Sequence, residues 1–207
     1  MIASFSQRFV FLHIPKNAGS AFRQSLRGAF LRDRSVVEGW GIEDGVDLAH
    51  PLPAFLRKRF PSVYELLADG GTNGIAVLRD PLDRCLAAFR EHRLQYGDHP
   101  DACGTLSGYL DHIEAGSYRE ENGTGYIFIH GAPQREFLFE GDELLYKDLL
   151  RLDDEVFYHK LCLLVGADLA PLARKNVGTG RSYVPAAEVR RILKLYEQDY
   201  ELMDSLD

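Results

Sequence analysis

The chain has 207 residues, of which 45% are hydrophobic and 27% charged, a composition typical of a single globular domain. Its formal net charge of −7 argues against nucleic acid as a partner, since proteins that bind nucleic acid usually present a basic face. The apolar runs are shorter than the roughly 20 residues that span a bilayer, and the first residues lack the pattern of a signal peptide. With three cysteines that show no metal-binding spacing, these features predict a cytoplasmic protein without a membrane anchor.

The first predicted element is a strand at residues 8–14, and a helix is predicted over residues 18–31. The loop between them, PKNAGS at residues 15–20, contains Lys16, Gly19 and Ser20. In such a unit the loop N–H groups and the positive end of the helix point at one spot, where they bind anions. The loop therefore predicts a phosphate or sulfate site near Lys16. The alternative is a plain strand-to-helix turn, with Pro15 as the breaker.

This loop differs from the loop of proteins that hydrolyse ATP or GTP. Their Walker motif places the Lys directly before the Ser or Thr, whereas Lys16 precedes Ser20 by four positions. No strand ends in an Asp that is well suited to magnesium. We therefore expect neither a triphosphate-hydrolysing site nor a metal.

A second strand and helix are predicted at residues 75–79 and 82–96, after a helix at residues 53–60. Asp80 is a good N-cap, and Pro81 suits a first helical turn. Arg79 has no such structural reason. It is a cation at the carboxyl end of an apolar strand, where open parallel sheets bind ligands. A salt bridge to a nearby Asp is the alternative for this residue.

Further helices are predicted at residues 106–115, 122–130, 155–165 and 185–202. Strands that alternate with helices predict an α/β fold, in which helices cover both faces of a parallel sheet.

Two of these segments resemble the sulfotransferase superfamily. HIPKNAGS at residues 13–20 is similar to the family's 5′-phosphosulfate loop, and VLRDPLDR at residues 77–84 to its 3′-phosphate segment. The resemblance is to the Golgi-type and bacterial branch that includes carbohydrate O-sulfotransferases. It implies a P-loop-like three-layer sandwich over residues 1–207, with a central parallel sheet that includes a strand near residues 145–152. It also implies 3′-phosphoadenosine 5′-phosphosulfate (PAPS) as co-substrate. Residues 134–138 (QREFL) and 196–200 (YEQDY) resemble further family segments.

The resemblance also implies which residues form the site. Lys16 would neutralise the departing oxygen, and His50, in a segment similar to the family's G-H-x-P, would be the catalytic base. The residues that would bind the donor are Pro15, Lys16, Asn17, Ala18, Gly19, Ser20, Ala21, Arg79, Ala87 and Arg181.

Position 87 departs from the family pattern, which has Ser there. The lost hydroxyl would cost roughly 1.5–3 kcal/mol of binding free energy to a charged phosphate, unless Arg181 or Ser182 compensates.

The histidines are open to other interpretations. His50 could be a loop histidine held by Pro51, and His13 is expected to pack behind the site. His92 could face the acceptor or be an exposed helix residue, and His130 shows no distinguishing signal.

The function that follows is transfer of a sulfuryl group from PAPS to a hydroxyl of a carbohydrate or another small acceptor. A degenerate nucleotide-binding module is the alternative that Ala87 supports. A nucleotide kinase is disfavoured by the loop spacing.

Overall fold

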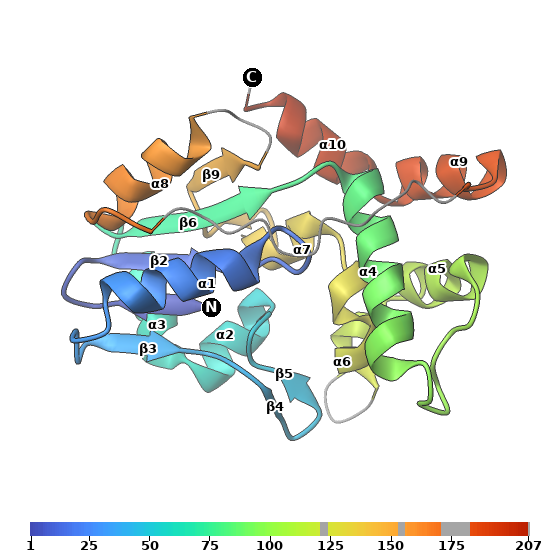
Figure 1. Cartoon of the computed structure of the whole chain (residues 1–207), viewed down its shortest axis with the longest axis horizontal. Coiled ribbons are helices and arrows are strands. Elements are labelled where there is room, and N and C mark those ends of the chain that lie inside the picture. Colours follow the sequence, from blue (N-terminus) through green and yellow to red (C-terminus); the bar gives the residue numbers. More distant parts are fainter. Residues whose placement is uncertain (121–123, 153–155, 171–182, 207) are drawn as a thin grey trace.

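A central five-stranded sheet organises the fold (Figure 1). The computed structural model describes residues 1–120, 124–152, 156–170 and 183–206. The strand order is β3-β1-β2-β6-β9, formed by β3 (Val36–Glu38), β1 (Ile2–Ser4), β2 (Phe9–Leu12), β6 (Asn73–Leu78) and β9 (Asp148–Arg151). Two short hairpins stand apart from it: β4 (Ile42–Glu43) with β5 (Val46–Asp47), and β7 (Phe139–Glu140) with β8 (Glu143–Leu144).

The sheet is mixed, so the predicted parallel sheet is wrong at one strand. β2, β6 and β9 are parallel, whereas β1 runs antiparallel to both β2 and β3. The turn at residues 5–8 explains the reversal, because a parallel connection needs a dozen or more residues. The prediction overlooked residues 2–4 as a strand.

Helices cover both faces of the sheet. They are α1 (Gly19–Ala29), α2 (Pro53–Arg59), α3 (Pro61–Ala68), α4 (Pro81–Tyr96), α5 (Leu106–Glu114), α6 (Gly125–Phe128), α7 (Gln134–Leu138), α8 (Phe157–Val165), α9 (Ala186–Leu195) and α10 (Glu197–Asp204), with 3-10 turns η1 (Ser117–Arg119) and η2 (Ile129–Gly131). The single helix predicted near the C-terminus is two helices, and the prediction did not include α3. No helix in the described part of the chain is long and apolar enough to span a membrane.

The alternation of side chains along the strands assigns each helix to a face. Phe9, Phe11, Ile75 and Val77 pack in one core with residues of α1 and α8. Their neighbours in the strands, Val10, Leu12, Ala76 and Leu78, pack in the other core with residues of α2 and α3. Figure 1 accordingly shows α1 in front of the sheet and α3 behind it, while α4, α5, α6 and α9 gather at one end.

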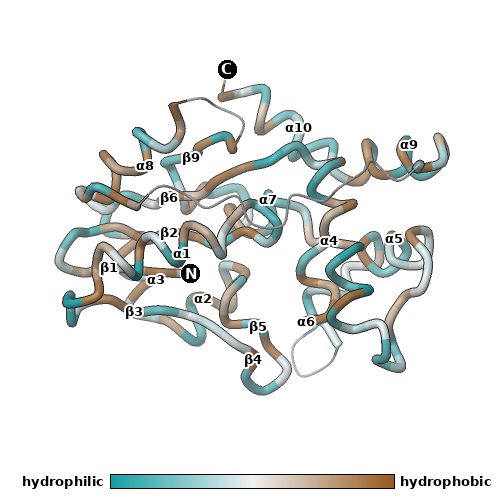
Figure 2. The backbone as a smooth tube through the Cα atoms, viewed as in Figure 1, coloured by the Kyte–Doolittle hydropathy of each residue, from teal (hydrophilic) through white to brown (hydrophobic). Residues whose placement is uncertain are grey.

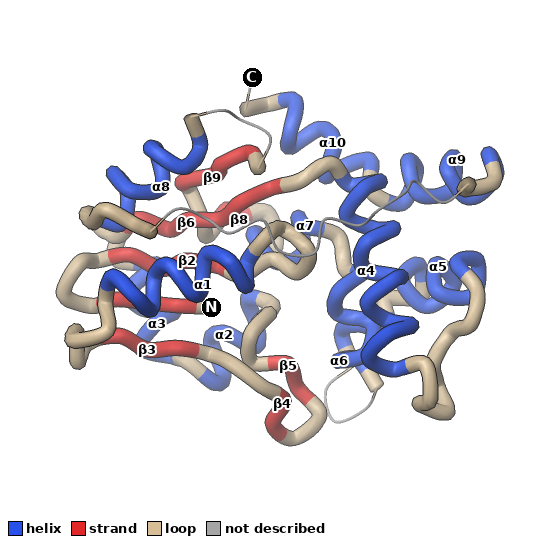
Figure 3. Tube along the Cα trace, in the orientation of Figure 1, coloured by secondary structure: helices blue, strands red, loops and turns tan. Residues whose placement is uncertain are grey.

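The carboxyl ends of β2 and β6 position the site. Because these strands are parallel neighbours, the turns that follow them lie at the same edge of the sheet (Figure 3). The hydrophobic stretch of β6 gives way there to the hydrophilic turn that leads into α4 (Figure 2). At this turn the Asp80 carboxylate accepts the N–H of Asp83 at 2.8 Å, with Pro81 in the first turn, which confirms the predicted start of α4.

Candidate functional site

The two predicted anion-binding turns contact each other directly. The Arg79 Nη1 donates to the carbonyl oxygen of Lys16 at 3.0 Å, and Arg84 Nε donates to that of Pro15 at 3.1 Å. In the other direction, Asn17 Nδ2 donates to the carbonyl oxygen of Val77 at 2.7 Å. Side chains of each strand-and-turn segment thus bind the backbone of the other, across 60 to 69 residues of sequence.

Gln134, at the start of α7, joins the turns a second time. Its Oε1 accepts from Asn17 Nδ2 at 2.7 Å and from the backbone N–H of Arg79 at 3.1 Å, while its Nε2 donates to the carbonyl of Arg79 at 2.9 Å. The Asp199 carboxylate in turn accepts the backbone N–H groups of Gln134 and Arg135 at 2.7 and 2.8 Å. α10 therefore supports the residue that aligns the two turns.

The backbone of the loop is in an unusual conformation. Lys16 (φ 67°) and Ala18 (φ 61°) both adopt the left-handed region, which costs a non-glycine residue roughly 1–2 kcal/mol. Ala18 is also the N-cap of α1 and provides no side-chain cap, so the first N–H groups of the helix have no capping side chain. Strain of this kind at a helix N-terminus is typical of an anion-binding loop.

Lys16 supplies the charge of this loop, and that charge already has a partner. Its Nζ lies 3.0 Å from Oε2 of Glu91 on α4. The two side chains retain 22% and 25% of their exposure, so the ion pair is largely shielded from solvent.

Three histidines and one aspartate pack beside the loop. His50 Nδ1 lies 2.7 Å from Asp47 Oδ2, and His130 Nε2 lies 3.9 Å from the same oxygen. The ring centroid of His50 is 4.4 Å from that of His13 and 5.1 Å from that of His130. All three imidazoles are buried.

Burial and neighbouring positive charge keep these imidazoles neutral. Burial lowers the pKa of His50 well below 6.5, and the positive charges of the N-terminal amine, Arg84 and Lys16 lower it further. The pKa of His130 falls to about 3 and that of His13 well below 6.5, in both cases first because of burial and then because a proton on the neighbouring His50 would repel a second positive charge. Burial raises the pKa of Asp47. The site thus contains neutral imidazoles, and the charge of Lys16 helps to lower the pKa values of His50 and His130.

Unpaired polar atoms concentrate at this site. In the described part of the chain, seven buried side-chain nitrogen or oxygen atoms have no hydrogen-bond partner. Four of them belong to this site: His13 Nδ1, Asn17 Oδ1, Arg84 Nη1 and His130 Nδ1. Buried polar groups are seldom left unpaired, so this concentration marks a place built to meet a ligand or water.

The structure brings most of the predicted site residues together. Residues 15–20 form the loop and the start of α1, and Arg79 and His50 lie beside it through the contacts above. Ala87 is buried on α4 between Arg84 and Glu91. Arg181 lies outside the described residues.

Neither interpretation of His92 was right. It is buried, its Nδ1 lies 3.0 Å from the carbonyl of Ile127, and its Nε2 accepts the N–H of Cys103 at 2.9 Å. One ring nitrogen therefore connects α4 to α6, and the other connects α4 to the loop that precedes α5.

The structure adds Glu91, His130 and Gln134 to the residues of the site. Glu91 and His130 gave no signal in the sequence, because their partners are far away in the chain. Gln134 and Asp47 could have been found, since both lie in segments that resemble family motifs.

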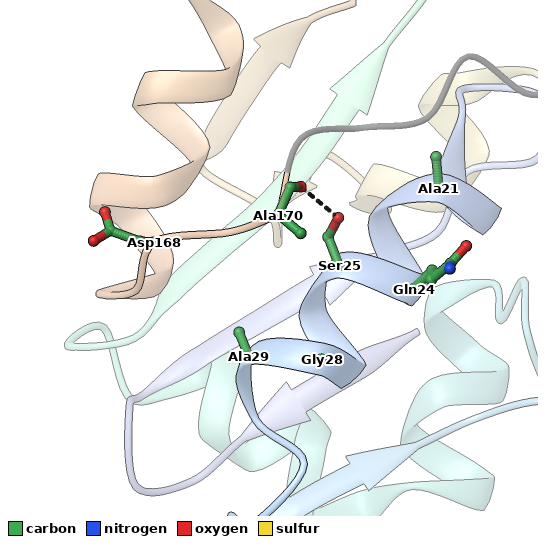
Figure 4. A pocket seen from close by; sticks show the side chains of 7 residues that line it. All are labelled: Ala21, Gln24, Ser25, Gly28, Ala29, Asp168 and Ala170. Carbon is green, nitrogen blue, oxygen red and sulfur yellow. Dashed lines mark hydrogen bonds between the residues drawn. The ribbon is translucent and has the colours of Figure 1, made fainter.

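A cavity of about 460 Å³ lies beside α1 (Figure 4). It is lined by Ala21, Gln24, Ser25, Gly28, Ala29, Asp168 and Ala170. Of the residues predicted to bind the donor, Ala21 contributes to this lining. Ser25 Oγ donates to the carbonyl oxygen of Ala170 at 2.8 Å across it. The cavity therefore adjoins the loop but does not lie between the two turns.

The cluster of His50, His130 and Asp47 has the residue types of a metal site. Asp47, His50 and His130 each offer a ligand atom, and these atoms lie within 4.8 Å of one another. The positive charges of Lys16 and Arg84, which already lower the pKa of His50, oppose a cation there. The charge balance favours an anion beside this cluster.

Comparison of the chain with protein-family models, curated proteins and solved structures found no match. The chemistry of the site's own residues is therefore the ground for a function.

Proposed function

We propose that this chain is a PAPS-dependent sulfotransferase, with a P-loop-like fold, that acts on a hydroxyl of a carbohydrate or another small acceptor. The observation that carries the proposal is the direct hydrogen bonding between the Lys16 loop and the Arg79 turn. Joined in this way, the turns offer two cationic side chains and a helix N-terminus to one ligand with two anionic ends, such as a 3′-phosphorylated phosphosulfate.

In this proposal the donor's phosphosulfate lies against the loop N–H groups of residues 18–20, because those of Asn17 and Ala21 already donate to backbone carbonyls. Its 3′-phosphate meets Arg79. Arg84 keeps the loop in place through the carbonyl of Pro15. Ala87 offers no hydroxyl to the phosphate, so donor binding depends more heavily on the cations.

The proposed transfer is an in-line displacement at sulfur. The acceptor oxygen forms a new S–O bond, the bond from sulfur to the bridging oxygen breaks, and the negative charge left on that oxygen is neutralised by Lys16. His50 is the proposed base. Its Nδ1 faces Asp47, which leaves Nε2 as the nitrogen that takes the proton of the acceptor hydroxyl.

The deciding experiment is a calorimetric titration with adenosine 3′,5′-bisphosphate and with ATP, each with and without magnesium. We expect binding of the bisphosphate that needs no magnesium, and weaker binding of ATP. Transfer of labelled sulfate from PAPS to a panel of hydroxyl compounds then tests catalysis.

Lys16→Ala should lower the transfer rate by orders of magnitude, because the leaving oxygen loses its cation. Lys194→Ala is the matched control, since Lys194 is exposed on α9. A nearly unchanged transfer rate in Lys16→Ala would contradict the role of Lys16 in neutralising the leaving oxygen.

A nucleotide-binding module without catalysis is the second candidate, and the buried Ala87 is the observation that favours it. Binding of the bisphosphate with no transfer to any acceptor would support it. Magnesium-dependent binding of ATP instead would support a nucleotide kinase.

A further inference from the structure

The cation of the anion-binding loop is occupied by a carboxylate of the protein itself. Lys16 Nζ and Glu91 Oε2 are 3.0 Å apart, and both side chains are about three-quarters buried. The ammonium group has two further N–H donors, but its single charge is already balanced by a carboxylate, whose negative charge repels any sulfate or phosphate that approaches. While this ion pair is intact, an anion that binds through Lys16 therefore competes with Glu91 for the charge of the ammonium group.

α4 holds Glu91 in this place. Arg84, Ala87 and Glu91 follow one another at spacings of three and four residues, so they lie on one face of the helix. From this face, Arg84 donates to the carbonyl of Pro15, and Glu91 accepts from the side chain of Lys16. Gln95, one turn further on, donates to the other oxygen of Glu91. Both carboxylate oxygens of Glu91 are thus hydrogen-bonded, and Gln95 helps to hold the Glu91 side chain against Lys16.

We propose that Glu91 is an internal counter-ion of Lys16, which an anionic ligand must displace before the loop can hold it. The inference rests on the proposed function, since it concerns the same donor site. A small anion that contacts the loop alone gains too little to replace a shielded carboxylate. A ligand with a second anionic end gains the contact with Arg79 as well, and so completes the exchange. Glu91 thereby makes the site selective for the bisphosphate nucleotide over free sulfate or phosphate.

Glu91→Gln tests the exchange, because it removes the charge and keeps the shape. We expect the dissociation constant for adenosine 3′,5′-bisphosphate to fall about 3- to 10-fold, the range of a partly shielded ion pair. The dissociation constant for inorganic phosphate should fall by at least the same factor, so that the preference for the bisphosphate over phosphate declines. Glu65→Gln, at an exposed carboxylate on α3, is the matched control and should change neither affinity. In a Lys16→Met background, Glu91→Gln should lose its effect.

A second measurement does not depend on any nucleotide. The rate at which a small acylating reagent modifies Lys16, followed by mass spectrometry, should rise severalfold in Glu91→Gln and in Glu91→Ala, because the amine loses its negatively charged partner. It should not rise in Glu65→Gln.

The outcomes separate this inference from the proposed function. If the wild type binds the bisphosphate and Glu91→Gln binds it no more tightly, the role of Glu91 as a counter-ion is wrong, whereas the proposed donor site is supported. If Lys16 reacts faster in the Glu91 variants while no variant binds the bisphosphate, the ion pair is confirmed and the proposed function fails. An unchanged rate of Lys16 modification overturns the counter-ion whatever the nucleotide does.

Discussion

Asp47 determines which nitrogen of His50 is available for chemistry. A carboxylate 2.7 Å from Nδ1 keeps the proton on that nitrogen, so the lone pair is on Nε2. The second oxygen of Asp47 accepts the backbone N–H of Ala49 at 2.9 Å, which fixes the carboxylate in the turn before His50. The four residues from Asp47 to His50 thus contain both the imidazole and the carboxylate that orients it.

His50→Ala should reduce the rate of sulfate transfer about 10²- to 10⁴-fold, as for the loss of a general base. Asp47→Asn should reduce it less, because the base is kept but is oriented less well. Burial lowers the pKa of His50, so the wild-type rate should be level through neutral pH and fall only well below pH 6.5. A pH series of kcat checks this.

His159→Ala, at an exposed position on α8, is the control for removal of an imidazole. A small loss of rate in His50→Ala with the same pH profile as the wild type would mean that another group accepts the proton.

At the scale of elements, the break between α9 and α10 connects the end of the chain to the site. Tyr196 at the break donates its hydroxyl to the carbonyl of Gly131 at 2.6 Å, and the N–H of Leu82 donates to the hydroxyl of Tyr200 at 3.2 Å. Asp199 caps α7 through Gln134. The YEQDY segment therefore secures the starts of α4 and α7, from which Arg84 and Gln134 reach the loop.

Helix α1 begins where it does because Gly19 leaves room for His13. A Cβ at Gly19 would lie 1.6 and 1.8 Å from ring atoms of His13, whereas a Cβ at Gly28 of the same helix would meet nothing within 4 Å. Gly19→Ala should therefore destabilise the fold by about 1–3 kcal/mol and weaken bisphosphate binding, because the ring and the loop must shift. Denaturation by urea measures the change.

Gly28→Ala is the matched substitution, and it should stabilise the protein by roughly 0.5–1 kcal/mol. Equal stabilities of the two variants would show that His13 can move away without cost.

At the scale of the whole molecule, the buried histidines link stability to pH. His13, His50 and His130 have folded-state pKa values below 6.5, so below that pH the unfolded chain binds more protons than the folded one. Their contribution to stability is complete above pH 6.5 and is lost progressively as pH falls. His92, whose pKa burial also lowers, acts in the same direction.

We expect the free energy of unfolding to fall between pH 6.5 and pH 5, by up to about 1.4 kcal/mol per pH unit for each of these histidines. Asp47 and Asp199, whose pKa values burial raises, act in the opposite sense and nearer the range of carboxyl titration. Urea denaturation at several pH values measures the slope. The same series on His13→Gln should show a smaller slope, and a wild-type stability that is level down to pH 5 would contradict the neutral cluster.

Much of the fold was predictable because its signals are local. The two strand–turn–helix units at residues 8–31 and 75–96 depend on an apolar run, a breaker and a cap, and the structure confirms both. β1, β3 and the four strands of the two hairpins were missed because each strand has only two or three residues, too few for a periodic pattern. The antiparallel direction of β1 is explained by the turn at residues 5–8, which is too short for a parallel connection to β2.

The amino-acid sequence was enough to predict that a loop with Lys16 and a turn with Arg79 follow two strands, since each is built from consecutive residues. The tertiary structure decided what surrounds them: Glu91 on Lys16, His130 beside Asp47, and Gln134 between the two turns. These partners are separated by some 55 to 117 residues, and only the packing of helices at the sheet edge brings them within 4 Å. Local preferences shape a turn, whereas charge and hydrogen bonding in a site depend on distances that only the folded chain defines.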